Sequence, residues 1–341
     1  MGSSFLFIFS FLCTAVFSVQ SFAQYDVVVV GGGLSGLVTT VELQKEKKVL
    51  LIEAGSRWGG RVHTVGTSRG LVEDGAEFVD RTNNFLLQLV NRYKLELIEL
   101  DKRTNRMRFS FDSKVYSYDE LEQKIFTENR EQLERLQRLD LRSDRSISQA
   151  LSDAGFGEFV KNVINTIVYS ETGKNISTIA HSELGGYVRF DLDTRKMHIL
   201  PNADESFKVK GGTGSVVSSL SSELLPESFM LNTRLQVVRS TPQGFELTIA
   251  TNTGQRKIQS RELVISVPPF QLKDIEFKID AKGKASLRQI TDMPFAQNTK
   301  LYLFFDKKIW NELGFSGAGW SDKGFLFFDS SQGQASKAGT L

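Results

Sequence analysis

Val27-Val-Val-Val-Gly-Gly-Gly-Leu-Ser-Gly-Leu37 lies close to the start of the chain and joins an apolar run to a cluster of glycines. The run from Tyr25 to Val30 predicts a buried strand, and Gly31, Gly33 and Gly36 follow in the spacing G-x-G-x-x-G at the start of a predicted helix. One glycine permits a tight turn, one lets the backbone approach a ligand, and one lets the helix pack closely on the strand. The free N–H groups at such a helix start favour an anion.

A second strand and an acidic residue follow in the order that a dinucleotide site requires. Val49 to Ile52 predict a buried strand that ends in Glu53. In βαβ units that bind dinucleotides, a carboxylate at this place accepts hydrogen bonds from ribose hydroxyls, and Ser35 can add a hydroxyl at the glycine turn. The glycine spacing alone is a weak signal, but the complete series predicts the adenosine half of a nucleotide cofactor.

The segment Gly59-Gly60-Arg61 indicates which kind of nucleotide is bound. A nicotinamide dehydrogenase has no need of a second glycine pair and an arginine just after its ribose-binding acid. A longer cofactor, whose pyrophosphate and ribityl chain run past the first turn, needs backbone room and a fork-shaped cation for phosphate oxygens. Arg57 either binds phosphate as well or braces the loop.

With these motifs the chain resembles the flavin amine oxidase family, which includes monoamine oxidases, polyamine oxidases and L-amino acid oxidases. The resemblance runs from about residue 25 to the last residue. Beyond the motifs above, it is carried by the segments Val72–Phe78, Asn84–Tyr93, Phe207–Val216, Leu231–Val238, Val264–Pro269 and Met293–Tyr302.

The resemblance implies an α/β fold in which a Rossmann-like FAD-binding domain is interleaved with an α+β substrate domain. It implies FAD as the cofactor, with Leu235 placed against the adenine. The expected cofactor-binding residues are Gly31, Gly33, Ser35, Gly36, Glu53, Arg57, Gly59, Gly60, Arg61, Gly75, Ala76, Glu77 and Leu235.

Lys300 is the expected catalytic residue. In the family a lysine at this place holds a water near the flavin N5 and takes part in flavin reoxidation. A cation there favours the anionic reduced flavin and the negative charge that develops as electrons pass to oxygen. Read without the family, Lys300 would be a surface lysine at the start of a strand.

The implied reaction is the oxidative deamination of a primary or secondary amine, with O2 as acceptor and an imine or carbonyl compound and hydrogen peroxide as products. The substrate class stays open. A buried arginine would indicate an amino acid substrate, and Arg189 is one position for it. Two alternatives remain: a flavin desaturase or protoporphyrinogen-oxidase-like enzyme, and a non-catalytic scaffold derived from a truncated oxidase.

Two positions depart from the family pattern. Gly55 stands where monoamine oxidases carry an arginine over the adenine. Asp80 falls where many relatives have glycine near the flavin, and a carboxylate facing inward there would disfavour an anionic reduced flavin. We expect Asp80 to face solvent.

Composition and charge say little about the function. The chain has 341 residues, enough for two domains, and its net charge of +2 is too small to indicate nucleic acid or an anionic membrane as a partner, so no nucleic-acid partner is expected. His63, His181 and His198 are scattered without metal-ligand spacing, so no metal is expected. The sequence leaves the oligomeric state open.

Residues 1–23 read as a secretory signal. Phe5 to Val19 are apolar and uncharged, and Ser21-Phe22-Ala23 forms a small-x-small cleavage pattern before Gln24. The basic n-region is missing, so an uncleaved anchor is the alternative, although the run is short for a membrane span. A secreted or periplasmic protein without a membrane anchor is therefore expected. The single cysteine, Cys13, lies in this leader, so the mature chain would form no disulfide.

The periodicity along the chain predicts alternating domain segments. Residues 24–100 form the first part of the FAD-binding domain, 101–205 a largely helical part of the substrate domain, 206–271 the return of the FAD-binding domain, and 272–341 the second part of the substrate domain. Lys300–Phe305 and Gly324–Phe328 are expected as strands. Because relatives continue beyond this point, the substrate domain is expected to be incomplete and to expose apolar surface.

Overall fold

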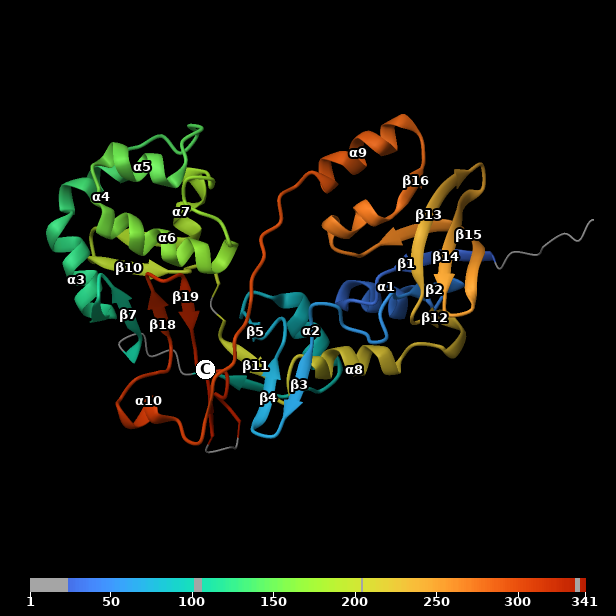
Figure 1. Ribbon diagram of the computed structural model, residues 1–341, viewed down its shortest axis with the longest axis horizontal. Coiled ribbons are helices and arrows are strands. Elements are labelled where there is room, and N and C mark those ends of the chain that lie inside the picture. Colours follow the sequence, from blue (N-terminus) through green and yellow to red (C-terminus); the bar gives the residue numbers. More distant parts are fainter. Residues whose placement is uncertain (1–23, 101–105, 204, 335–337) are drawn as a thin grey trace, which may run out of the picture.

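The computed structural model of the protein describes residues 24–100, 106–203, 205–334 and 338–341 (Figure 1). The predicted signal segment and Cys13 lie outside the described residues. None of the helices in the described ranges combines the length and the apolar character needed to cross a membrane.

The largest element is a sheet of seven strands in the order β12-β2-β1-β15-β14-β13-β16. β1 lies between β2 and β15 and is parallel to both, as expected for a βαβ unit, whereas β13, β14 and β15 form an antiparallel meander. The strands are β1 (Gln24–Val30), β2 (Val49–Ile52), β12 (Phe229–Met230), β13 (Arg234–Thr241), β14 (Gly244–Thr251), β15 (Gly254–Ile265) and β16 (Glu276–Lys278).

Both faces of β1 are buried, which explains its continuous valine run. Val27 and Val29 pack against Leu37 of α1 (Leu34–Leu43) and against α8 (Gly214–Ser222). Val28 and Val30 face the other way, where the β13–β15 meander supplies Leu235, Val238, Leu247, Ile249 and Ile258. Because successive side chains of a strand point to opposite faces, a strand covered on both sides must be apolar throughout.

Three small structures extend this region. β3 (Thr64–Thr67) and β4 (Gly70–Glu73) form a hairpin. β5 (Phe78–Val79) and β6 (Leu97–Glu99) both pair with β11 (Phe207–Val209), which joins segments separated by more than a hundred residues. α2 (Asn84–Arg92) begins at an Asn83 cap, where the side chain accepts the Leu86 N–H.

A second hydrophobic core lies in the other lobe of Figure 1, where helices cover a four-stranded sheet of order β19-β18-β7-β8. Phe109, Leu121, Ile147, Ile164 and Trp320 are among its buried members. Its elements are β7 (Arg108–Phe111), β8 (Lys114–Ser117), α3 (Tyr118–Glu128), α4 (Arg130–Gln137), α5 (Ile147–Ala154), α6 (Glu158–Thr172), α7 (Leu184–Tyr187), β9 (Val188–Asp191), β10 (Lys196–Ile199), β18 (Gly319–Ser321) and β19 (Phe325–Phe327).

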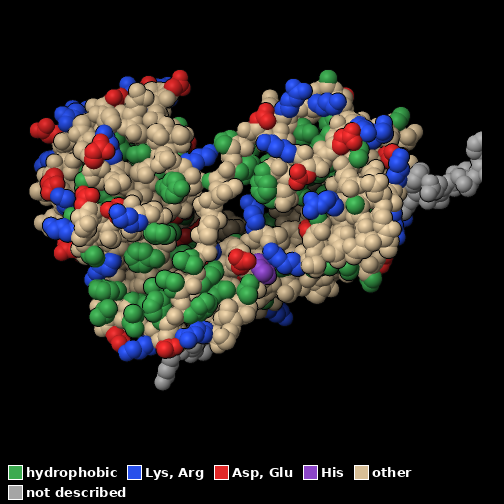
Figure 2. All heavy atoms as spheres, viewed as in Figure 1, with side chains coloured by type: hydrophobic (Ala, Val, Ile, Leu, Met, Phe, Trp, Pro, Cys, Tyr) green, Lys and Arg blue, Asp and Glu red, His purple; other side chains and the backbone are tan. Residues whose placement is uncertain are grey.

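An extended segment connects α9 (Ala281–Thr291) with β17 (Phe304–Phe305) and passes between the two lobes (Figure 1). The surface is hollowed on both sides of this segment (Figure 2). After β17 the chain forms α10 (Ile309–Glu312) and later β20 (Gly339–Thr340), which pairs with β17.

The prediction of a strand over Lys300–Phe305 is wrong in extent. Only Phe304–Phe305 is a strand, since among the described residues the segment Gly339–Leu341 alone pairs with it. The expected strand at Gly324–Phe328 is confirmed as β19. The large sheet continues to β16, beyond residue 271 where we placed a domain boundary, and the division into domains stays a prediction.

Apolar side chains are exposed along the connecting segment, with Leu301 74% and Leu303 50% accessible. Others lie on or near α10 and β19, where Figure 2 shows hydrophobic side chains gathered on the surface. Apolar surface of this kind was expected for an incomplete substrate domain, and that incompleteness stays a prediction.

Candidate functional site

The glycine turn after β1 has the geometry that its sequence predicts. Gly31 adopts φ +104°, in the region that favours glycine, and its N–H donates to the Ile52 carbonyl at 2.8 Å. A Cβ built on Gly36 would lie 1.9 Å from the Gly31 carbonyl oxygen. Gly31 therefore permits the turn, and Gly36 lets α1 begin against it.

The start of α1 is open to a ligand. Gly33 is the N-cap, and no side chain in the described part of the chain caps the first N–H groups of the helix. A Cβ on Gly33 would meet a single neighbour, the Gly59 carbonyl oxygen at 4.0 Å, so the space above this residue is free. Ser35 is exposed in the first turn. Uncapped N–H groups and the positive end of the helix dipole suit a phosphate.

The second glycine pair lies directly beside this turn. The Gly59 N–H donates to the Gly32 carbonyl at 2.8 Å, and Gly33 and Gly59 form a parallel bridge. Gly59 and Gly60 both have positive φ. The Trp58 ring occupies the place of a Gly32 Cβ, which would approach it to 2.4 Å. The requirement for glycine at position 32 comes from this tertiary contact, so the motif spacing did not reveal it.

Glu53 fixes the glycine turn as well as facing the site. Its carboxylate accepts the Gly32 N–H and the Gly55 N–H, each at 2.7 Å. The two bonds engage different oxygens, and each oxygen retains a lone pair for a ribose hydroxyl. The structure therefore places this acceptor at the end of β2, as the sequence predicts.

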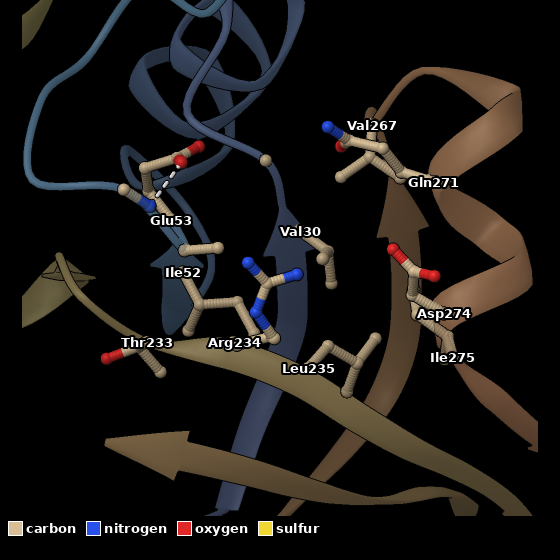
Figure 3. A pocket seen from close by; sticks show the side chains of 13 residues that line it. Val30, Ile52, Glu53, Thr233, Arg234, Leu235, Val267, Gln271, Asp274 and Ile275 are labelled. Atoms are coloured by element: carbon tan, nitrogen blue, oxygen red, sulfur yellow. Dashed lines mark hydrogen bonds between the residues drawn. The ribbon is translucent and has the colours of Figure 1, made fainter. Parts of the chain in front are cut away.

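A cavity of about 260 Å³ opens beside Glu53 (Figure 3). Leu235, the residue expected against the adenine, lines it together with Gly31 and Glu53. Sequence reasoning missed several polar residues of the same cavity, among them Arg234, Gln271 and Asp274. Arg234 could have been predicted from the sequence, because it directly precedes Leu235. The other two come from a 3-10 turn over Pro269–Asp274 that only the fold brings here.

The two arginines of the second motif have different roles. The Arg57 guanidinium donates to the carbonyls of Trp58 and Gly60 at 3.2 and 2.9 Å, so it braces the loop, the second of the two roles considered for it. Arg61 is exposed, and within the described part of the chain its guanidinium makes no hydrogen bond or ion pair. It is therefore the cation left for a phosphate.

Arg61 also connects the glycine turns to the predicted catalytic lysine. Its carbonyl accepts the Ala76 N–H at 3.0 Å, and a Cβ on Gly75 would lie 2.1 Å from the same oxygen. The Lys300 ammonium in turn donates to the Gly75 carbonyl at 2.8 Å and to the Glu73 carbonyl at 3.0 Å. The backbone of Gly75 and Ala76 thus lies between Arg61 and Lys300.

Glu77 differs from the simple expectation of a cofactor contact. Its carboxylate is buried and accepts hydrogen bonds from Lys208, Lys300 and Ser330 rather than facing open space. Only its backbone is left to face a ligand. Lys208 has no motif of its own in the sequence, and its place in this cluster follows from the pairing of β11 with β5.

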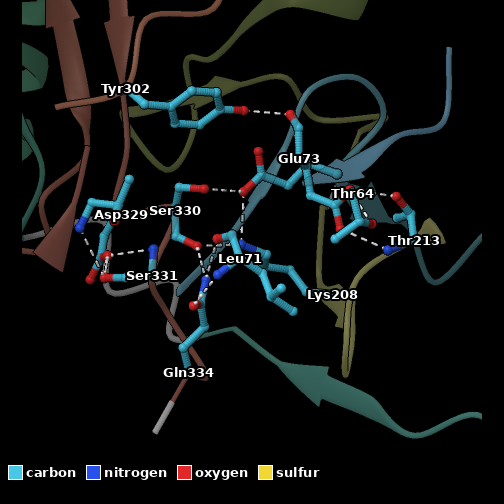
Figure 4. Close-up of polar contacts among 12 residues, drawn as sticks. Thr64, Leu71, Glu73, Lys208, Thr213, Tyr302, Asp329, Ser330, Ser331 and Gln334 are labelled. Atoms are coloured by element: carbon cyan, nitrogen blue, oxygen red, sulfur yellow. Dashed lines mark hydrogen bonds and ion pairs between the residues drawn. The ribbon is translucent and has the colours of Figure 1, made fainter. Parts of the chain in front are cut away.

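Glu73, the last residue of β4 and two residues before Gly75, has its own set of carboxylate partners. Its carboxylate accepts bonds from Thr64 and from Thr213 at the start of α8, and Tyr302 donates to its carbonyl (Figure 4). Burial raises the pKa of the Tyr302 hydroxyl above its usual value, and Glu77 adds to this. Tyr302 is therefore a neutral donor at physiological pH.

The remaining candidates lie elsewhere. We expected Asp80 to face solvent. Instead its side chain is half-buried and accepts the Glu205 N–H at 2.6 Å. Arg189 is exposed, which contradicts its use as a buried carboxylate receptor. His63 pairs with Asp74 at 3.3 Å. Across the described residues, no group of three or more His, Cys, Asp or Glu is placed to hold a metal.

Comparison with known proteins assigns the class. The model of the flavin-containing amine oxidoreductases matches residues 34–338, which is most of the chain. The chain belongs to this family.

Particular relatives are distant and longer. An L-amino acid dehydrogenase from Synechocystis sp. is 24% identical over 86% of this chain and 66% of its own length. Flavin-containing amine oxidase A from Equus caballus is 23% identical over 86% of this chain and 59% of its own. The structure of cyclohexylamine oxidase from Brevibacterium oxydans is 17% identical, covers 93% of this chain and 74% of its own, and superposes with a TM-score of 0.74, so it shares the fold.

Proposed function

We propose that the protein binds FAD in an extended form along the contacts described above. The adenosine would occupy the cavity beside Glu53 and Leu235. The pyrophosphate would lie over the start of α1, where Gly33 leaves open space and Arg61 supplies a cation. The backbone of Gly75 and Ala76 and the Lys300 ammonium would face the flavin ring. Open backbone, a ribose acceptor and an arginine that no described residue pairs with together fit such a ligand.

We propose further that the protein oxidises a primary or secondary amine. FAD, when bound, supplies the two-electron acceptor for the hydride equivalent that leaves the carbon bearing nitrogen. The chain would hold the ring beside Lys300, whose positive charge favours the negative charge that develops on reduction. With O2 as the final acceptor, the amine and O2 would give an imine and hydrogen peroxide, and water would convert the imine to a carbonyl compound and ammonia or a smaller amine.

One observation carries this proposal most directly. Lys300, from the connecting segment, donates to the carbonyl of Gly75, and Gly75 packs on Arg61 beside the glycine turns. Lys300 and Arg61 are more than two hundred residues apart in sequence. The backbone of Gly75 and Ala76 contacts both of them, so the predicted reactive lysine lies close to the predicted phosphate ligand.

The electron acceptor and the substrate define the test. Purified protein supplied with FAD is assayed for hydrogen peroxide over monoamines, polyamines and L-amino acids. Peroxide formed with an amine supports the proposal. Turnover with an artificial acceptor alone would indicate a dehydrogenase, and turnover of a carbon skeleton would indicate the desaturase or protoporphyrinogen-oxidase-like alternative. A folded, colourless protein would indicate a non-catalytic scaffold.

The role of Lys300 has its own test. If the flavin of a Lys300→Met variant is reoxidised by O2 at the wild-type rate, Lys300 does not take part in reoxidation.

We propose export for the mature protein, because residues 1–23 carry the features of a secretory signal. The test is the N-terminal sequence of the protein secreted by its host or collected from the periplasm. A mature chain that begins at Gln24 supports export, and a chain retained in the cell with Met1 contradicts it.

A further inference from the structure

A buried cluster lies behind the proposed flavin position and contains more positive than negative charge. The Lys208 ammonium donates to Glu77 Oε1 and to the Ser330 carbonyl, each at 2.7 Å. Lys300 donates to Glu77 Oε2 at 3.0 Å. The side chains of Glu77 and Lys208 are 1% and 9% exposed, whereas Lys300 is 35% exposed and forms the outer end of the cluster.

The charges of this cluster do not cancel. Two ammonium groups share one carboxylate, so Lys208, Lys300 and Glu77 together carry one net positive charge. The nearby Glu73 directs its carboxylate to Thr64 and to Thr213 at the start of α8, where the helix dipole stabilises it. The buried Asp329, directly before Ser330, directs its carboxylate to Trp310 and Ser331. Asp74 is exposed and pairs with His63. A buried charge is weakly screened, so its field reaches further than that of a surface ion.

We propose that Lys208 is a positioning residue for Lys300 and the buried source of this excess positive charge. Lys208 occupies one oxygen of Glu77, so the Glu77 charge is shared between two ammonium groups and does not fully neutralise Lys300. Lys300 keeps its hydrogen bond to the Gly75 carbonyl. The proposal rests on the FAD site proposed above. Its consequence is that the flavin ring lies in a positive field that favours negative charge on the ring.

Sulfite is the probe, because it adds reversibly to oxidised flavin, bleaches its visible absorbance and leaves negative charge on the ring. In Lys208→Met the cluster becomes neutral, and we expect sulfite to bind roughly tenfold more weakly. In Glu77→Gln the cluster gains positive charge, and sulfite is expected to bind more tightly than in the wild type. If the cluster had only a structural role, the two substitutions would not change the sulfite affinity in opposite directions.

Lys210→Met is the matched control, since Lys210 lies two residues along the chain but pairs with Glu96 at the surface, where both side chains are over 60% exposed. Its sulfite affinity should equal that of the wild type. If Lys208→Met fails to fold, Glu77→Gln still decides the matter. Unchanged sulfite affinity in the folded variants overturns the role of Lys208 and leaves the FAD site standing, whereas a wild-type chain that retains no flavin overturns both.

Discussion

Glu53 accepts backbone N–H groups of the glycine turn and also lines the ligand cavity. Its negative charge should therefore affect both the shape of the turn and the affinity for the ligand. Its two oxygens accept N–H groups of Gly32 and Gly55 at 2.7 Å. Glu53→Gln replaces one acceptor oxygen with a donor that must face an N–H group, and we expect FAD to bind roughly 10- to 100-fold more weakly. Titration of the flavin-free protein with FAD measures the change.

Glu46→Gln is the control for this measurement, because Glu46 is exposed and makes no side-chain hydrogen bond or ion pair within the described part of the chain. Its FAD affinity should match that of the wild type. Equal affinities of the Glu53 and Glu46 variants would show that Glu53 does not contact the cofactor or shape its site.

Gly36 has no room for a side chain. A Cβ there would lie 1.9 Å from the Gly31 carbonyl oxygen, so Gly36→Ala must displace α1 from β1 and is expected to destabilise the protein by about 3 kcal/mol. Denaturant unfolding gives the value. Gly66→Ala is the comparison, since a Cβ on Gly66 meets nothing within 4 Å and should change stability little. Equal stability of the two variants would refute the packing argument.

At this scale the sequence predicted residues whose role depends on the local backbone. Gly31, Gly36 and Glu53 act through neighbours along β1, β2 and α1, so spacing was enough to find them. Lys208 acts through contacts that only the assembled sheets create, and no local pattern distinguishes it from a surface cation.

Among the elements, α3 begins with a complete capping box. The Ser117 Oγ accepts the Glu120 N–H at 3.2 Å, and Glu120 accepts the Ser117 N–H at 2.7 Å. Hydrogen bonds from the Ser117 N–H and then from its hydroxyl hold the pKa of Glu120 below its usual 4.5. Because the folded pKa is the lower one, this stabilisation is present above the unfolded pKa and is lost as the pH falls through the folded pKa.

Ser117→Ala should therefore raise the Glu120 pKa part of the way back toward 4.5, since the backbone donor remains. An NMR titration of the Glu120 side chain measures this shift. The variant should also be less stable than the wild type at neutral pH, with a smaller difference in acid. A Glu120 pKa that does not move would show that the hydroxyl does not contribute.

Regular elements with strong internal signals could be predicted, and partner-dependent ones could not. The β2 bounds, Val49–Ile52, match the prediction, and the helices between Tyr118 and Thr172 lie in the range that was expected to be largely helical. Lys300–Tyr302 was also expected in a strand but forms none, because a strand exists only where another pairs with it. Lys300 and Tyr302 nevertheless both reach the Glu73 carbonyl.

For the whole molecule, the order of contacts would give the proposed FAD a direction. The cavity at Glu53 and Leu235 comes first, the Gly33–Gly59 bridge and Arg61 follow, and Gly75 with Lys300 comes last. Motif order along the chain predicted which end would bind adenosine. It could not predict that Glu77 faces inward to two lysines, because that depends on β11 and on the segment that carries Ser330.

A crystal structure of the protein grown with FAD tests this direction most directly. The account predicts adenosine beside Glu53 and Leu235, pyrophosphate at the start of α1 near Arg61, and the flavin ring against Gly75 and Lys300. A flavin bound in the reverse direction, or a folded chain whose glycine turns hold no FAD at saturating concentration, would contradict it.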